Sequence, residues 1–222
     1  MQKLIRPHSL TTDVIIFTIE NGQLKILLIK RANDPFKNKW ALPGGFINDN
    51  EGSQDAALRV LKNKAGLKNV YLEQLYTFDG SSRDPRGRVC TVVYFALVLL
   101  EDIKFESGKK LQTPVFYPVN KLPQLAFDHK KIVTYAIKRL RSKLEYTNAV
   151  YALLPKTFTF NQLQTTYEAI FGKNMDKRNF RKKFSMLKLI KPTKKILTGN
   201  RQRPARLYYF INRKPAELKK FF

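Results

Sequence analysis

The sequence has little sulfur and no long apolar run. Only one of its 222 residues is a cysteine, Cys90, which excludes a framework of internal disulfides and a cysteine-rich metal site. Its longest apolar stretch, residues 92–100, is too short to cross a bilayer. The first residues, MQKLIRPHSLTTD, lack the apolar core of a signal peptide. We therefore expect a cytoplasmic protein without a membrane partner.

Acidic residues are also scarce. The chain has 17 of them against 42 lysines and arginines, which gives a formal net charge of +25. Such an excess favours a polyanionic partner, although a basic surface that only maintains solubility has the same composition. The charge is densest at the C-terminal end, where residues 151–222 contain 18 lysines and arginines and 3 acids. This distribution is typical of a separate nucleic-acid-binding module.

The most specific pattern lies in residues 44–67, GGFINDNEGSQDAALRVLKNKAGL. It resembles the Nudix box, G-x5-E-x7-R-E-U-x-E-E-x-G-U, in which U is a bulky aliphatic residue. Six positions match the pattern: Gly45, Glu51, Arg59, Leu61, Gly66 and Leu67. The three glutamate positions of its core instead hold Val60, Asn63 and Lys64.

These three positions share one helix face, because they are spaced i, i+3 and i+4. In Nudix hydrolases that face presents carboxylates to Mg²⁺, which bridges the substrate phosphates. Valine has no ligand atom, asparagine is neutral and lysine is positive. The resemblance therefore implies a Nudix scaffold with no metal, no cofactor and no catalytic residues. We expect Gly45 and Gly66 to permit tight turns. We also expect Glu51 and Arg59 to form a pair that braces the loop against the helix.

Alternating apolar residues predict a hairpin over residues 12–31, with its turn at Glu20-Asn21-Gly22. Apolar spacing along the chain further predicts helices at 54–65 and 129–146, and strands at 70–78, 89–100 and 116–119. Strands mixed around one box helix fit a Nudix α/β/α sandwich. The second helix is expected to be a linker or the closing helix of that sandwich.

The last third is expected to be a winged helix-turn-helix. An extended piece at 157–160 precedes a first helix, which Asn161 is expected to cap and Gly172 to end. Asp176 is expected to cap a second helix, which Pro192 ends. Two strands, 194–198 and 205–211, then form a basic hairpin.

The second helix is amphipathic, with Phe180, Phe184 and Leu187 in one stripe. A charged helix face is usually only solvated, but a second helix in this motif enters the DNA major groove. RNA is the weaker alternative, because no aromatic stacking platform is present. The candidate DNA-binding residues are Lys177, Arg178, Asn179, Arg181 and Lys182 on the helix and Arg201, Arg203 and Arg206 on the hairpin.

Four segments resemble the Nudix-related transcriptional regulators of NAD metabolism: SRDPRGRVCTVVYFAL, LLPKTFTFNQLQTTYEAIFG, MDKRNFRKK and RPARLYYF. The resemblance implies an α+β chain, with a Nudix-like sensor at 1–128, a linker helix at 129–150 and a winged helix-turn-helix at 151–222. It also implies a homodimer that binds double-stranded operator DNA. The expected effector is ADP-ribose or a related NAD-derived nucleotide.

Candidate effector contacts are Arg31, Arg83, Arg86 and Arg88, whose guanidinium groups match pyrophosphate geometry. Phe46 is a candidate for contact with a base or ribose, and core packing is its alternative. Lys64 is placed to hold a phosphate where the metal would lie, and an ordinary surface lysine is its alternative. Asp84-Pro85 is a natural turn starter, so the arginines around it also have a structural interpretation.

Three other functions fit the sequence. An active Nudix hydrolase would need displaced metal ligands, with Glu51, Asp49 or Asp55 as candidates. A regulator of the same family that responds to a sugar would share every motif. An architectural or RNA-binding protein would carry a vestigial pocket. The sequence leaves open the effector, the operator, the sign of regulation and strand exchange between protomers.

Overall fold

The computed structural model describes residues 8–105, 114–199 and 202–218, without the side chains of Gln202 and Arg203. This part of the chain divides into two compact units. The N-terminal unit extends to Ala136, and the C-terminal unit comprises the residues from Ile137 onward together with two short segments, Thr18–Leu24 and Val98–Leu100. Among the described residues, none of the helices has the length and apolar character needed to cross a lipid bilayer.

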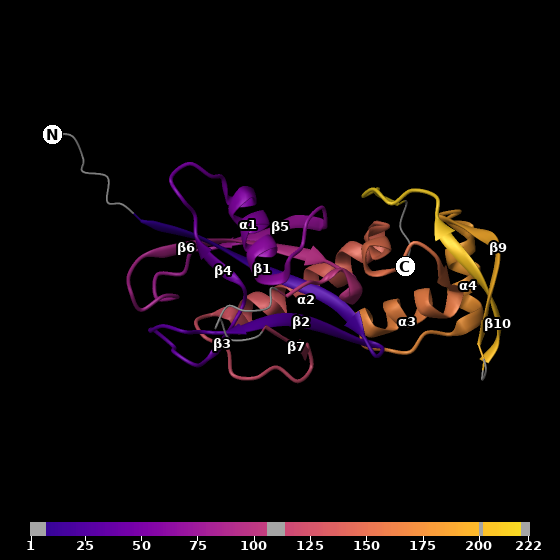
Figure 1. Cartoon of the computed structure of the whole chain (residues 1–222), viewed down its shortest axis with the longest axis horizontal. Helices are drawn as coiled ribbons and strands as arrows, with labels where there is room; N and C mark the ends of the chain where they lie inside the picture. The colour runs from indigo at the N-terminus through magenta and orange to yellow at the C-terminus, as the bar shows by residue number, and fades with distance from the viewer. Residues whose placement is uncertain (1–7, 106–113, 200–201, 219–222) are drawn as a thin grey trace. The chain divides into compact units, whose positions relative to one another are not determined.

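A mixed sheet forms the centre of the N-terminal unit (Figure 1). Its path runs β3-β2-β1-β6-β5, while β4 pairs with β1 and β7 pairs with β2. β1 and β6 are parallel, whereas β4 on β1, β3 and β7 on β2, and β5 on β6 are antiparallel. The strands are β1 (Ser9–Glu20), β2 (Gln23–Lys30), β3 (Trp40–Ala41), β4 (Gly44–Phe46), β5 (Tyr71–Phe78), β6 (Val89–Leu97) and β7 (Val115–Pro118).

The predicted hairpin is confirmed by β1 and β2. Its turn residues Asn21 and Gly22 have φ values of 51° and 70°, the left-handed pair that matches the twist of two antiparallel strands. Residues 11–18 of β1 are all buried. Because successive side chains of a strand point to opposite faces, β1 is covered on both faces, as a sandwich requires.

Helix α1 (Ser53–Ala65) confirms the helix predicted from the box. It buries Ala56, Ala57 and Leu61 completely and packs against β4 and β6. The expected brace is also present. Arg59 donates through Nε to Glu51 Oε2 at 2.9 Å and through a second nitrogen to the other carboxylate oxygen.

The two box glycines differ in role. Gly66 ends α1 with φ +63°, and a Cβ there would lie 2.3 Å from the carbonyl oxygen of Lys104. The expectation of a tight turn at Gly45 is wrong, because this residue lies in β4, its φ is not left-handed, and no atom would lie within 4 Å of an added Cβ. The close approach occurs at Gly44, where a Cβ would lie 2.2 Å from Asp13 Oδ1.

The C-terminal unit has the predicted order of helix, turn, helix and hairpin. Its sheet has the order β8-β10-β9. Helix α2 begins in the N-terminal unit and continues into this one. The elements are α2 (His129–Tyr146), the 3₁₀ helix η2 (Ala149–Leu153), β8 (Phe158–Thr159), α3 (Phe160–Phe171), α4 (Lys177–Met186), β9 (Ile190–Gly199) and β10 (Gln202–Phe210); a second 3₁₀ helix, η1 (Leu100–Asp102), follows β6.

Two predicted helix boundaries are wrong, the start of α3 and the end of α4. Asn161 does not cap α3, because Thr159 accepts from the Gln162 amide and Gln162 accepts from the Thr159 amide in return. This reciprocal box begins the helix earlier. Pro192 does not end α4, which stops at Met186. Pro192 lies instead in β9, an edge strand that tolerates a missing N–H group. Gly172 and Asp176 confirm their predicted capping positions.

An aromatic cluster forms the core of the C-terminal unit. Phe184 of α4 is fully buried, and its ring lies between 5.7 and 6.4 Å from those of Phe160, Tyr167, Phe180 and Phe210. Because the phenylalanines of α4 point inward, its basic residues face outward. This orientation confirms the predicted stripe for Phe180 and Phe184, whereas Leu187 lies just beyond the end of α4 and is only half-buried.

Gly66→Ala is expected to lower the free energy of unfolding by more than about 1 kcal/mol, because the added methyl group meets a backbone oxygen in a left-handed conformation. Urea unfolding measures the change. Gly45→Ala is the matched control, since it adds the same methyl group in open space. Equal losses of stability in the two variants would contradict this assignment.

Candidate functional site

A pocket in the N-terminal unit collects most of the predicted effector residues. Arg31, Arg83, Arg86 and Phe46 line it, whereas Arg88 and Lys64 are not among its lining residues. Its volume is about 140 Å³. The other lining residues are Thr11, Asp13, Ile29, Ala41, Leu42, Gly44, Gly45, Asp84, Phe127 and His129.

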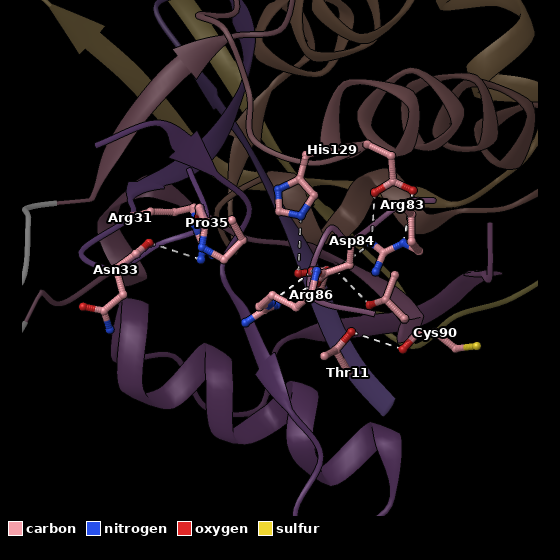
Figure 2. A network of polar contacts seen from close by, with 12 residues as sticks. Thr11, Arg31, Asn33, Pro35, Arg83, Asp84, Arg86, Cys90 and His129 are labelled. Carbon is pink, nitrogen blue, oxygen red and sulfur yellow. Dashed lines mark hydrogen bonds and ion pairs between the residues drawn. The ribbon is translucent and has the colours of Figure 1, made fainter. Parts of the chain in front are cut away.

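Arg86 is fixed by a neighbouring acid (Figure 2). Its Nε and one terminal nitrogen donate to the two oxygens of Asp84 at 3.0 and 2.7 Å, and its backbone amide donates to the same carboxylate. These bonds confirm the turn predicted at Asp84-Pro85, and the side-chain bond from Arg86 holds the pKa of Asp84 below its usual range. The guanidinium group still reaches the pocket, 5.4 Å from the Phe46 ring and 5.7 Å from the Phe127 ring.

Arg31 also lies beside the ring of Phe127. Its guanidinium carbon is 4.7 Å from the centre of Phe127, and its Nε donates to the carbonyl oxygen of Pro35 at 2.7 Å. Burial and the positive charge of Arg86 both lower the pKa of Arg31. Two guanidinium groups lie near the Phe127 ring and repel each other, and an anion bound between their charges would reduce this repulsion.

Arg83 is paired with acidic side chains of the protein itself. Its guanidinium group donates to both oxygens of Asp128, at 3.2 and 2.9 Å, and its side chain is only 5% exposed. One terminal nitrogen also lies 3.8 Å from Asp13 Oδ2. Arg83 therefore shapes the pocket wall from within an ion-pair network.

The pocket lining includes an acid and a histidine that the sequence analysis did not single out, Asp13 and His129. His129 Nδ1 accepts a hydrogen bond from the Leu42 amide at 2.9 Å, so its other nitrogen carries the proton of the neutral ring, 3.8 Å from Asp13 Oδ1. Asp13 also accepts from Thr91 at 2.8 Å. An acid within an apolar strand was the one available signal, and His129 had none beyond the start of a helix.

The box helix presents no carboxylates at the three altered positions. Val60 is buried in the core, Asn63 is exposed and Lys64 is partly buried. Glu51 is bound by Arg59, whose hydrogen bond holds the pKa of Glu51 below its usual range. In the described part of the chain, no three His, Cys, Asp or Glu side chains gather in a group suited to a metal ion.

The candidate DNA-binding residues on α4 form an exposed basic face. All five of them, Lys177, Arg178, Asn179, Arg181 and Lys182, are exposed. Arg181 also lies 4.8 Å from the centre of the Phe160 ring, which restricts its position. On the hairpin, Arg206 is exposed, while Arg201 and the side chain of Arg203 lie outside the described residues.

Comparison with known families accounts for both units. The NUDIX domain model matches residues 9–136, more than half of the chain, and the NrtR DNA-binding winged helix domain model matches residues 150–210. The ADPR-responsive transcriptional repressor NtrR of Acinetobacter baylyi is 37% identical over 205 residues, which cover 90% of this chain and 81% of the relative. The chain belongs to the NrtR family.

Solved structures of NrtR proteins share this architecture. Shewanella oneidensis NrtR in complex with a 27mer DNA is 35% identical, with a TM-score of 0.80 over 90% of this chain and 93% of that one. The NUDIX domain of the same protein in complex with ADP ribose is 36% identical, with a TM-score of 0.55 over 63% of this chain and 93% of that one. The family resemblance and the fold class predicted from the sequence are therefore confirmed.

Stability should fall when His129 is forced to accept a proton. Burial lowers the pKa of His129 in the folded state, while the unfolded chain binds the proton near its ordinary value of about 6.5. Stability is therefore full above about pH 6.5 and decreases as the pH falls toward the folded-state pKa, by up to about 1.4 kcal/mol per pH unit.

Urea unfolding between pH 7.5 and 5.5 measures this loss. His129→Asn should remove much of it, because asparagine can accept from the Leu42 amide without titrating. His8→Asn, a change at the exposed second histidine of the chain, is the matched control and should behave as the wild type does. An unaltered pH dependence in His129→Asn would refute the assignment.

Proposed function

We propose that this protein is a transcriptional regulator that binds operator DNA through its winged helix domain. We propose further that its Nudix domain binds an NAD-derived nucleotide such as ADP-ribose without hydrolysing it. The observation that carries the proposal is the combination of two sites in one NrtR-family chain. One is a pocket with two guanidinium groups beside a single aromatic ring, and the other is an exposed basic face on α4.

The effector proposal rests on charge and shape. The diphosphate of ADP-ribose carries two negative charges, which suit Arg31 and Arg86. Phe46 is 49% exposed at the pocket, so its ring offers an apolar surface to a base or ribose. The Acinetobacter relative is ADPR-responsive, and the Shewanella NUDIX domain binds ADP ribose, which favours the same ligand here.

We propose that the protein does not hydrolyse its ligand, because Val60, Asn63 and Lys64 occupy the helix face that binds the metal in a hydrolase. In a hydrolase this face supplies metal-binding carboxylates, and here it supplies a buried methyl pair, an amide and an ammonium group. Two of the displaced ligands that an active enzyme would need have other roles. Glu51 binds Arg59, and Asp55 accepts from the Gly52 amide.

We also propose a homodimer, because a two-fold dimer matches a palindromic operator. Light scattering in solution measures this, and a monomer at micromolar concentration would contradict it. Regulation then requires that ADP-ribose have different affinities for the DNA-bound and free forms. A coupling of about 1–3 kcal/mol would change operator affinity by roughly 5- to 150-fold.

Arg31→Met is expected to weaken ADP-ribose binding by roughly 10- to 100-fold, because a charge-assisted hydrogen bond to phosphate is lost. Calorimetric titration measures the affinity. Arg88→Met is the matched control, since Arg88 is exposed and does not line the pocket. Unchanged affinity in Arg31→Met would remove this arginine from the site. As a second test, the wild type is incubated with ADP-ribose in the presence of Mg²⁺. Release of AMP at ordinary enzymatic rates would establish a hydrolase instead.

Arg178→Ala should weaken binding to the operator by about 1–3 kcal/mol if this residue contacts a guanine. Gel shifts with DNA fragments selected by the wild type measure the loss. Wild-type affinity should also fall steeply with salt, since phosphate contacts release counterions. Lys121→Ala, an exposed lysine outside the winged helix domain, controls for the loss of one charge. A flat salt dependence would argue against DNA as the partner.

A further inference from the structure

The winged helix domain has few acids, and two of them flank the turn between α3 and α4. Residues 151–222 contain only Glu168, Asp176 and Glu217 as acids. Asp176 caps α4 by accepting from the Asn179 amide at 2.8 Å. Glu168 lies in the last turn of α3, where the helix dipole disfavours a negative charge. A carboxylate at that position therefore needs local interactions that offset the unfavourable dipole.

The offsetting interactions are a pair of hydrogen bonds to one oxygen. Glu168 Oε1 accepts from the Met175 amide at 2.8 Å and from Gln164 Nε2 at 2.9 Å. Gln164 Nε2 also donates to the Met175 carbonyl oxygen at 2.9 Å. Both backbone polar groups of Met175 are therefore held by side chains of α3. We call Gln164 and Glu168 the turn clamp.

The glutamine is held in a conformation that leaves one of its own atoms unsatisfied. Gln164 is only 6% exposed, and its Oε1 is buried without a hydrogen-bond partner among the described residues. Rotating the amide would aim that oxygen at two acceptors, the carboxylate and the Met175 carbonyl. The amide is thus fixed by the clamp, and an apolar side chain would avoid the unsatisfied oxygen.

Met175 immediately precedes the cap of α4, and Lys177 and Arg178 follow it. The clamp therefore fixes the first turn of α4 relative to α3. Base-edge contacts need side chains placed accurately in the groove, whereas phosphate contacts are sequence-independent and tolerate displacement. A loosened turn would reduce selectivity between sequences more than it reduces general DNA affinity.

We propose that Gln164 and Glu168 are positioning residues that set the orientation of α4 and thereby the sequence selectivity of the protein. This inference rests on the proposed function, because it requires that α4 bind DNA. The clamp touches no DNA itself. It acts through the backbone of Met175, and its contribution is measured as the ratio of operator affinity to affinity for a scrambled duplex.

The test compares Glu168→Gln, Glu168→Leu and Gln164→Met in the intact two-domain chain. Dissociation constants are measured for the duplex that the wild type selects and for a scrambled duplex of the same composition. Glu168→Gln should keep the wild-type ratio, because a single carbonyl oxygen can accept both bonds. Glu168→Leu and Gln164→Met should lower the ratio by roughly tenfold or more, with an unchanged salt slope on the scrambled duplex.

Glu217→Gln is the charge-matched control, since it removes one acid of the same domain from a position outside the clamp. If Glu168 acts only by repelling DNA, each of Glu168→Gln and Glu217→Gln would tighten binding to the operator and to the scrambled duplex by the same factor. That result would overturn the proposal. Gln164→Met loses two hydrogen bonds but also removes the unsatisfied oxygen, so it should lose less stability than Glu168→Leu. It therefore provides a folded test even where Glu168→Leu is unstable.

An unchanged selectivity ratio in Gln164→Met would overturn the clamp while leaving DNA binding intact. A wild-type protein that selects no sequence would overturn the proposed function and the clamp with it. A lowered ratio in Gln164→Met together with a retained ratio in Glu168→Gln is the outcome that supports the clamp.

Discussion

A shortage of carboxylates constrains both units of this protein. With 17 acids for 42 cationic side chains, the acids around the pocket and the α3–α4 turn each bind a particular partner. Asp84 binds Arg86 and Asp128 binds Arg83, while Asp176 binds the first turn of α4. These acids do not neutralise the surface. They fix the positions of a few groups and leave the remaining positive charge available to anions.

The pocket shows what this arrangement achieves. Bidentate pairing with Asp84 holds the guanidinium group of Arg86 at a position near the rings of both Phe46 and Phe127. Arg31 approaches the second of these rings from another segment. These side chains are therefore held in place within the protein, and such preorganisation would reduce the entropic cost of binding the proposed effector.

The Nudix box separates scaffold from chemistry. The Glu51–Arg59 brace and the left-handed Gly66 preserve the loop and helix, while Val60 has become part of the core. A carboxylate at position 60 would now need solvation or a metal ion in a buried site. The same scaffold that positions a catalytic helix in a hydrolase can thus support a binding pocket, and a winged helix domain gives such a pocket a use in gene control.

The sequence by itself determined the hairpin, the box helix, the brace, the amphipathic α4 and the order of the winged helix, because these depend on local periodicity, capping and a spaced motif. It also identified Arg31, Arg86 and Phe46, which line the pocket. Only the tertiary structure brought Asp13, Phe127 and His129 to the same place, and showed that Arg83 is occupied by Asp128. Those contacts join residues far apart in the chain, and no local pattern encodes which distant side chains will meet.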